Sequence, residues 1–306
     1  MDSLNPGHGT PRGPVFSTKR LADPLSTSTE NFRVVVAFDS ISIVAIIFLP
    51  IIILTAAFSS RIVRVSTWFM VVGSMLMISV ANVLLLGHQT GPLPPRALCL
   101  IQAMLMYGYP NLASFAGVSF MIQVYLSIRL ALRTGSKLSK ASERWLCIIP
   151  CLMFLATLVE VLVIGLLNSK KIKRDPSGAY CDFITPVPYL KVSLILFAVL
   201  VMFVLQALII LKIRRGSRSL GAFHPAEHVS IDAVVRVCVF NFASVLVIVV
   251  SFIQSFPHRI PMLDFLSILS KALVPFCAVV VFGTQRDLLH VWMFWRRPPL
   301  TSHDPL

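Results

Sequence analysis

Three ionisable side chains lie inside long apolar stretches of the 306-residue chain: Asp39, Glu160 and Lys271. An unpaired charge at the centre of a bilayer costs about 3 kcal/mol on insertion scales. Such side chains therefore pair with one another, form hydrogen bonds between helices, or contact a ligand or ion. These three residues are the first candidates for chemistry in this sequence.

Asp39 and Lys271 are expected at similar depths, about six and eight residues from the same end of their apolar stretches. Opposite charges offset each other's desolvation, so we expect a buried Asp39–Lys271 ion pair if the first and last stretches are neighbours. Lys271 then has two interpretations, a structural tie or a direct ligand contact. Glu160 likewise either contacts a ligand or bonds to a neighbouring helix.

Polar side chains also surround a proline in the third apolar stretch, where Gln102 and Tyr109 accompany Pro110. A proline removes one backbone hydrogen bond, which can open a polar pocket or simply kink the helix. We expect a ligand-binding set that consists of Gln102, Tyr109, Glu160 and Lys271.

Seven apolar stretches must position these residues, and each is long enough to cross a bilayer. A helix needs about 20 residues to span the hydrocarbon layer. The stretches are apolar on all faces, which argues against the alternating pattern of a membrane barrel. We predict an all-α membrane protein with seven transmembrane helices, in a domain covering residues 34–284. The predicted spans are Val34–Phe58, Thr67–Leu86, Leu98–Ile128, Leu146–Leu167, Tyr189–Leu211, Ala233–Ile253 and Leu263–Phe282.

Composition supports this class. Apolar residues make up 56% of the chain and charged residues 13%, about half the usual charged share of roughly 25%. The net charge of +14 is spread over loops beside the spans, which favours membrane lipids and cytosolic proteins over nucleic acid as partners. Residues 1–33 are polar and proline-containing, so we expect a disordered extracellular tail.

The odd number of spans predicts termini on opposite sides of the plasma membrane. Basic residues are more frequent in the loops that share a side with the C-terminus, which predicts an N-terminus outside. Cys99 and Cys181 then both lie on the outer side, where an oxidising compartment allows a disulfide. Chance placement is the alternative, because sequence alone does not determine pairing.

A short amphipathic segment is predicted at residues 285–297, before a cytoplasmic tail at 298–306. Gly283 can end the seventh span, and Leu288, Leu289, Trp292 and Trp295 then lie on one helical face. Such a helix lies in the membrane interface with its indole rings at headgroup depth. It serves either as a simple anchor or in signalling.

Seven spans, Cys99 at the start of the third, Cys181 in the second outer loop, Pro275 in the seventh and a short eighth helix resemble a rhodopsin-like G-protein-coupled receptor. The Phe-Gly-Thr-Gln-Arg junction at 282–286 is most similar to the fungal members. The resemblance covers roughly residues 34–297 and implies an extracellular ligand and a cytosolic heterotrimeric G protein. The chain departs from the family pattern at Gln123-Val124-Tyr125, where the family has Asp/Glu-Arg-Tyr, and lacks its Trp-x-Pro hinge in the sixth span.

Basic residues cluster in the second and third inner loops. They either fix orientation and contact anionic lipid, or form a docking surface for the G protein. The residues assigned to this surface are Arg129, Arg133, Arg214, Arg215 and Arg218.

Other function classes are less favoured. The sequence contains no Gly-rich phosphate loop, His-Glu-x-x-His or Gly-x-Ser-x-Gly motif, so we expect no enzyme, no cofactor and no metal. A transporter should show internal repeats, and none is convincing here. A retinal pigment linked through Lys271 lacks a counter-ion in the third span, and Asp264 is about 10 Å away along the helix axis.

Overall fold

The computed structural model describes residues 24–59, 64–89, 92–133, 138–168, 172–175, 177–183, 189–219 and 261–293, and singly Arg236, Val239, Phe240, Phe242 and Val245. Helices dominate this part of the chain. They are α1 (Pro24–Phe58), α2 (Ser66–Val83), α3 (Arg96–Arg133), α4 (Lys140–Leu167), α5 (Tyr189–Ser219), α7 (Pro261–Gly283) and α8 (Arg286–Trp292).

Six of the seven predicted spans coincide with these helices, and the sixth, Ala233–Ile253, lies mostly outside the described residues. Five helices, α1 to α5, are long and apolar enough to cross a membrane. In α7 the described apolar portion, Ile268–Gly283, is shorter than these five spans. The prediction of an all-α membrane protein is thus supported by the described helices.

Several helices extend further than their apolar stretches. The first begins at Pro24, so the last part of the expected disordered tail is helical, and residues 1–23 lie outside the described part. The fifth runs to Ser219, which puts Arg214, Arg215 and Arg218 on a helix rather than in a loop. Lysine and arginine are good helix formers, so a basic sequence can continue the helix past its apolar part.

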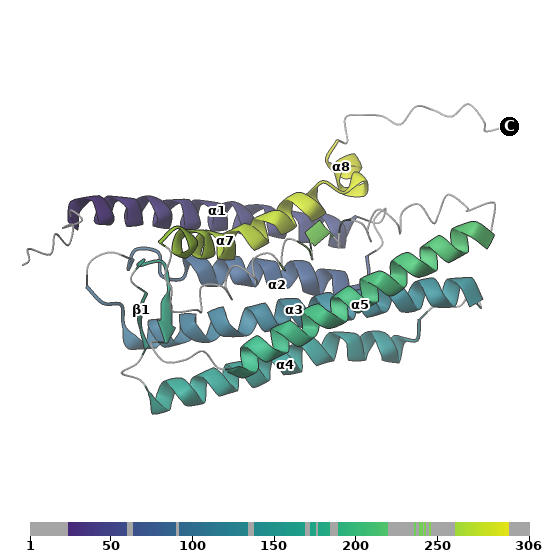
Figure 1. Cartoon of the computed structure of the whole chain (residues 1–306). Coiled ribbons are helices and arrows are strands. Elements are labelled where there is room, and N and C mark those ends of the chain that lie inside the picture. Colours follow the sequence, from purple (N-terminus) through teal and green to yellow (C-terminus); the bar gives the residue numbers. More distant parts are fainter. Residues whose placement is uncertain are drawn as a thin grey trace, which may run out of the picture.

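The long helices pack side by side (Figure 1). Helix α3 contacts α2, α4 and α5, and α1 contacts α2 and α7. A small antiparallel hairpin, β1 (Ile172–Arg174) and β2 (Cys181–Phe183), pairs Arg174 with Cys181. It lies at the end where α1 and α3 begin, whereas α8 and the ends of α3 and α5 lie at the opposite end. We call these the hairpin end and the α8 end.

The largest apolar cluster lies toward the α8 end and joins most of the helices. Leu288 of α8 is fully buried in it, so α8 is packed onto the long helices by its apolar face. Aromatic rings fill the centre, with Trp68 edge-on to Phe282 at 5.9 Å between centroids. Other members are Leu49, Ile52, Val72, Met75, Met121, Ile209, Phe240 and Ala278.

Candidate functional site at the hairpin end

The hairpin turn is tight and pressed against the segment that follows α2. Gly178 N donates to Asp175 O at 2.8 Å, and Asp175 N donates to Tyr180 O at 2.8 Å. Gly178 has φ of +80°, and a Cβ there would lie 2.8 Å from the carbonyl oxygen of Gln89. Both the left-handed backbone and the close approach require glycine.

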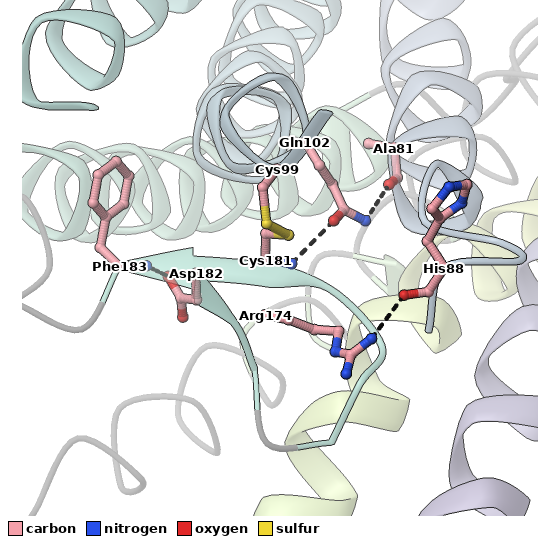
Figure 2. Close-up of a disulfide and its surroundings, with 8 residues drawn as sticks. All are labelled: Ala81, His88, Cys99, Gln102, Arg174, Cys181, Asp182 and Phe183. Carbon is pink, nitrogen blue, oxygen red and sulfur yellow. Dashed lines mark hydrogen bonds between the residues drawn. A yellow bond between two sulfur atoms is a disulfide. The ribbon is translucent and has the colours of Figure 1, made fainter. Parts of the chain in front are cut away.

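A disulfide fixes the hairpin to α3 (Figure 2). Cys99, in the first turn of α3, is bonded to Cys181 at the start of β2. The predicted pairing of these two cysteines is confirmed. In addition, Arg174 of β1 donates through Nη1 to the carbonyl of His88 at 3.0 Å, which ties the other strand to the segment after α2.

Gln102 completes this attachment from inside the protein. Its side chain is fully buried; Nε2 donates to Ala81 O at 3.2 Å and Oε1 accepts from Cys181 N at 3.0 Å. Figure 2 shows this amide between α2 and β2. Because both polar ends have protein partners, Gln102 anchors the hairpin to α2 and α3, and the ligand contact expected of it stays a prediction.

Asp39 and Lys271 take different partners, and no ion pair joins them among the described residues. Asp39 accepts two hydrogen bonds from Gln89 Nε2, at 2.9 and 2.8 Å. The Nζ atom of Lys271 lies 3.6 Å from the centroid of the Tyr180 ring. The expected ion pair is therefore replaced by two separate contacts, because the hairpin and the segment after α2 supply partners that helix depths alone could not reveal.

Tyr180 itself is buried among α1, α7 and the hairpin turn. Burial raises the pKa of its phenol, against the opposing effect of Lys271, so Tyr180 is neutral at physiological pH. Next in β2, Asp182 accepts a hydrogen bond from Tyr107 of α3 and one from Phe183 N at 2.7 Å. The hairpin thus contacts a lysine of α7 and a tyrosine of α3.

The remaining two predicted ligand residues lie away from these hairpin contacts. Tyr109 of α3 stacks on Phe154 of α4, with centroids 5.1 Å apart and planes 15° apart, which is an interhelical packing contact. Glu160 of α4 has a buried Oε2 without a hydrogen-bond partner in the described structure. A ligand role for Glu160 stays a prediction.

A second polar network lies at the α8 end. Arg64 forms an ion pair with Asp287 of α8 at 3.1 Å and donates to Gln285 Oε1 at 2.7 Å. Trp292 Nε1 donates to Thr55 Oγ1 of α1 at 3.1 Å. These bonds attach both ends of α8 to the first part of the chain.

The same end contains bonds between the long helices. Thr67 of α2 donates to Gln123 Oε1 of α3 at 2.6 Å, and Gln123 Nε2 donates to Glu143 Oε1 of α4 at 3.4 Å. Gln123 therefore joins α2, α3 and α4 through its side-chain amide. Arg236, from the predicted sixth span, donates to Val281 O at 3.1 Å and Thr284 Oγ1 at 2.8 Å, at the end of α7.

The predicted basic surface also lies at this end. Arg129 is exposed on α3. Arg133 lies on the last turn of α3, and Arg214, Arg215 and Arg218 lie on the last turns of α5; their side chains are outside the described part. Lys212 of α5 places Nζ 5.7 Å from the Tyr125 ring centroid of α3.

Sequence reasoning missed Tyr180, Gln89 and Arg64. The only indication of Tyr180 in the sequence was its position next to Cys181, which was identified. Gln89 and Arg64 lie in connecting segments, where apolar periodicity carries no information. Comparisons of the chain with protein-family models and with curated proteins found no match.

Proposed function

We propose that the chain is a seven-helix receptor of the plasma membrane that binds an extracellular ligand at the hairpin end. In this proposal, the α8 end faces the cytosol and signals to a heterotrimeric G protein. The observation that carries it is the disulfide-fixed hairpin over one end, with Tyr180 against Lys271 of α7. Because the hairpin contacts several helices, a ligand that binds beside it can favour one packing of those helices over another.

The other end supports the same function. Hydrogen bonds there link α2, α3 and α4 through Gln123, and link Arg236 to the end of α7. A ligand that favours one helix packing would change these contacts, because coupling between two sites requires an element with two arrangements. The basic ends of α3 and α5 would contact the G protein.

Nucleotide exchange tests the proposal. The full chain in phosphatidylcholine nanodiscs should accelerate guanine-nucleotide exchange on an added heterotrimeric G protein above the rate with empty nanodiscs. Arg129→Glu should reduce that acceleration severalfold, because it reverses a charge on the proposed docking surface.

Arg96→Glu is the matched control, since Arg96 is an exposed arginine in the first turn of the same helix at the hairpin end. It should leave exchange unchanged. No acceleration with any of several G-protein subtypes, or equal loss in both variants, would count against the receptor function. Uptake of solutes by the reconstituted chain would favour a transporter instead.

A further inference from the structure

Lys271 is a cation that forms no ion pair with a carboxylate of the described residues, although Asp182 and Asp175 are close enough to act on it electrostatically. Its side chain is half-buried in apolar α7, and no carboxylate in the described structure forms an ion pair with it. Its closest described contact is with the face of a neutral aromatic ring, Tyr180, at 3.6 Å from Nζ to the ring centroid. A cation on a ring face is stabilised less than a cation on a carboxylate with good hydrogen-bond geometry.

The acidic side chains near Lys271 in the described structure make their hydrogen bonds elsewhere. Asp175 accepts from Ser177 through Oδ2. Both carboxylate oxygens of Asp39 accept from Gln89, and Asp182 accepts from Tyr107 and from Phe183 N. None of these bonds involves Lys271. Among the described residues, the acidic groups near the hairpin end therefore form no ion pair with this lysine.

The surroundings of the Lys271–Tyr180 contact are apolar. Tyr180 packs in a buried cluster with residues of α1, α7 and the hairpin turn, and Met106 of α3 packs against the cluster. A ligand that reached Lys271 would need an apolar body next to its charged group. The buried members are Val35, Phe38, Ala179, Tyr180, Ile268 and Ala272.

The hairpin backbone on both sides of Tyr180 is held by bonds that do not involve its ring. Residue 181 is held independently, by the disulfide to Cys99 and by the bond from its N–H to Gln102. On the other side, Asp175 N donates to Tyr180 O and Gly178 N donates to Asp175 O, both at 2.8 Å. Rotation of the Tyr180 side chain alone would therefore uncover Nζ of Lys271 while the hairpin backbone stays in place.

From these contacts we infer that Lys271 binds the carboxylate of an apolar organic acid, which takes the place of the Tyr180 ring. This deepens the proposed function by naming the ligand class, and it rests on the hairpin end being the ligand end. The acid could come from solution or from the membrane, since both sources present the same chemistry.

Binding of radiolabelled decanoic acid to the full chain in phosphatidylcholine nanodiscs, without G protein, tests the inference. Lys271→Gln should weaken binding by about tenfold or more, and Lys271→Arg should stay close to the unsubstituted chain, because it keeps the charge. Tyr180→Ala should tighten binding about threefold or more, because the competing ring is gone. Lys173→Gln, at an exposed lysine of β1, is the control and should change nothing.

Competitors complete the test. Decanol should compete much less than decanoic acid, since it lacks the charge. Competition by hexanoic acid would indicate access from solution, and competition by palmitic acid alone would indicate access from the membrane.

Equal competition by decanol, unchanged binding in Lys271→Gln, or no gain in Tyr180→Ala would overturn the inference; the last variant keeps the test decisive if Lys271→Gln does not fold. Decanoic acid binding without nucleotide exchange would refute the receptor function while leaving the acid site intact. Exchange driven by a ligand that is not an acid would do the reverse.

Discussion

At the scale of single residues, Gln102 shows how a buried amide can join three elements. It bonds to the carbonyl of Ala81 in α2 and to the N–H of Cys181 in β2, from within α3. A hydrocarbon side chain in its place would leave the Cys181 N–H buried without this acceptor, whereas the Ala81 carbonyl would keep the bond from Leu84 N at 3.4 Å. A buried donor left unpaired costs about 1–3 kcal/mol.

We therefore expect Gln102→Leu to lower the free energy of unfolding by about 1–3 kcal/mol, measured as a lower melting temperature of the detergent-purified chain. Ile101→Leu is the control, because Ile101 is a half-exposed neighbour on the same helix. A melting temperature equal to that of the control would show that Gln102 is not an anchor.

Tyr180 should make the stability of the folded chain depend on pH in the alkaline range. Burial raises the pKa of its phenol in the folded state above the ordinary value of about 10. A raised folded-state pKa contributes stability that is present below the unfolded pKa and is lost as pH rises through the folded one. Tyr180→Phe keeps the ring over Lys271 but does not ionise.

Stability of Tyr180→Phe relative to the unsubstituted chain should thus rise above about pH 10 and be constant between pH values near 7 and 9. Melting temperatures of the two proteins, measured from neutral pH to above about pH 10, report the effect. A difference that does not change with pH would mean that Tyr180 titrates equally in the folded and unfolded states.

The residue scale also shows a limit of sequence reasoning. The buried ionisable residues were recognisable because each interrupts an apolar stretch. Their partners were not, since Gln89 and Tyr180 come from connecting segments whose paths depend on packing. The ion pair between Asp39 and Lys271 was expected because only helix depths were available to argue from.

At the scale of elements, the hairpin depends on the Cys99–Cys181 disulfide. The two cysteines are 82 residues apart in sequence, so the bond closes a long loop in the unfolded chain. Removing a crosslink of this kind costs about 2–5 kcal/mol. Its loss should also free the β2 strand from α3.

We expect the double variant Cys99→Ser with Cys181→Ser to melt at a lower temperature, measured by size-exclusion chromatography after heating. We also expect it to lose its preference for decanoic acid over decanol. Cys151→Ser is the control, because Cys151 is a free and exposed cysteine on α4. Equal melting of the double variant and the control would show that the hairpin is held by its hydrogen bonds alone.

Helix positions were predictable from apolar length, but helix ends were not. The first helix begins at Pro24 and the fifth ends at Ser219, both in polar sequence. Hydropathy reports where lipid can surround a helix, but it does not report where the helix ends. Lysine and arginine can continue α5 beyond its apolar part, and a proline such as Pro24 is favourable at the first position of a helix. The hairpin was not predicted at all, because strands of three residues leave almost no periodic pattern.

At the scale of the whole molecule, the two ends have different chemistry. The hairpin end carries a disulfide and a buried cation against a ring. The α8 end carries an arginine-centred network and the basic ends of α3 and α5. This asymmetry is what a protein needs if one end receives a chemical signal and the other transmits it.

The orientation of the chain tests this account most directly. Epitope tags at both termini should be stained differently in cells: the N-terminal tag in intact cells, and the C-terminal tag only after permeabilisation. Staining of both tags from the same side would mean an even number of spans, and would contradict a seven-helix receptor with the hairpin outside and α8 in the cytosol.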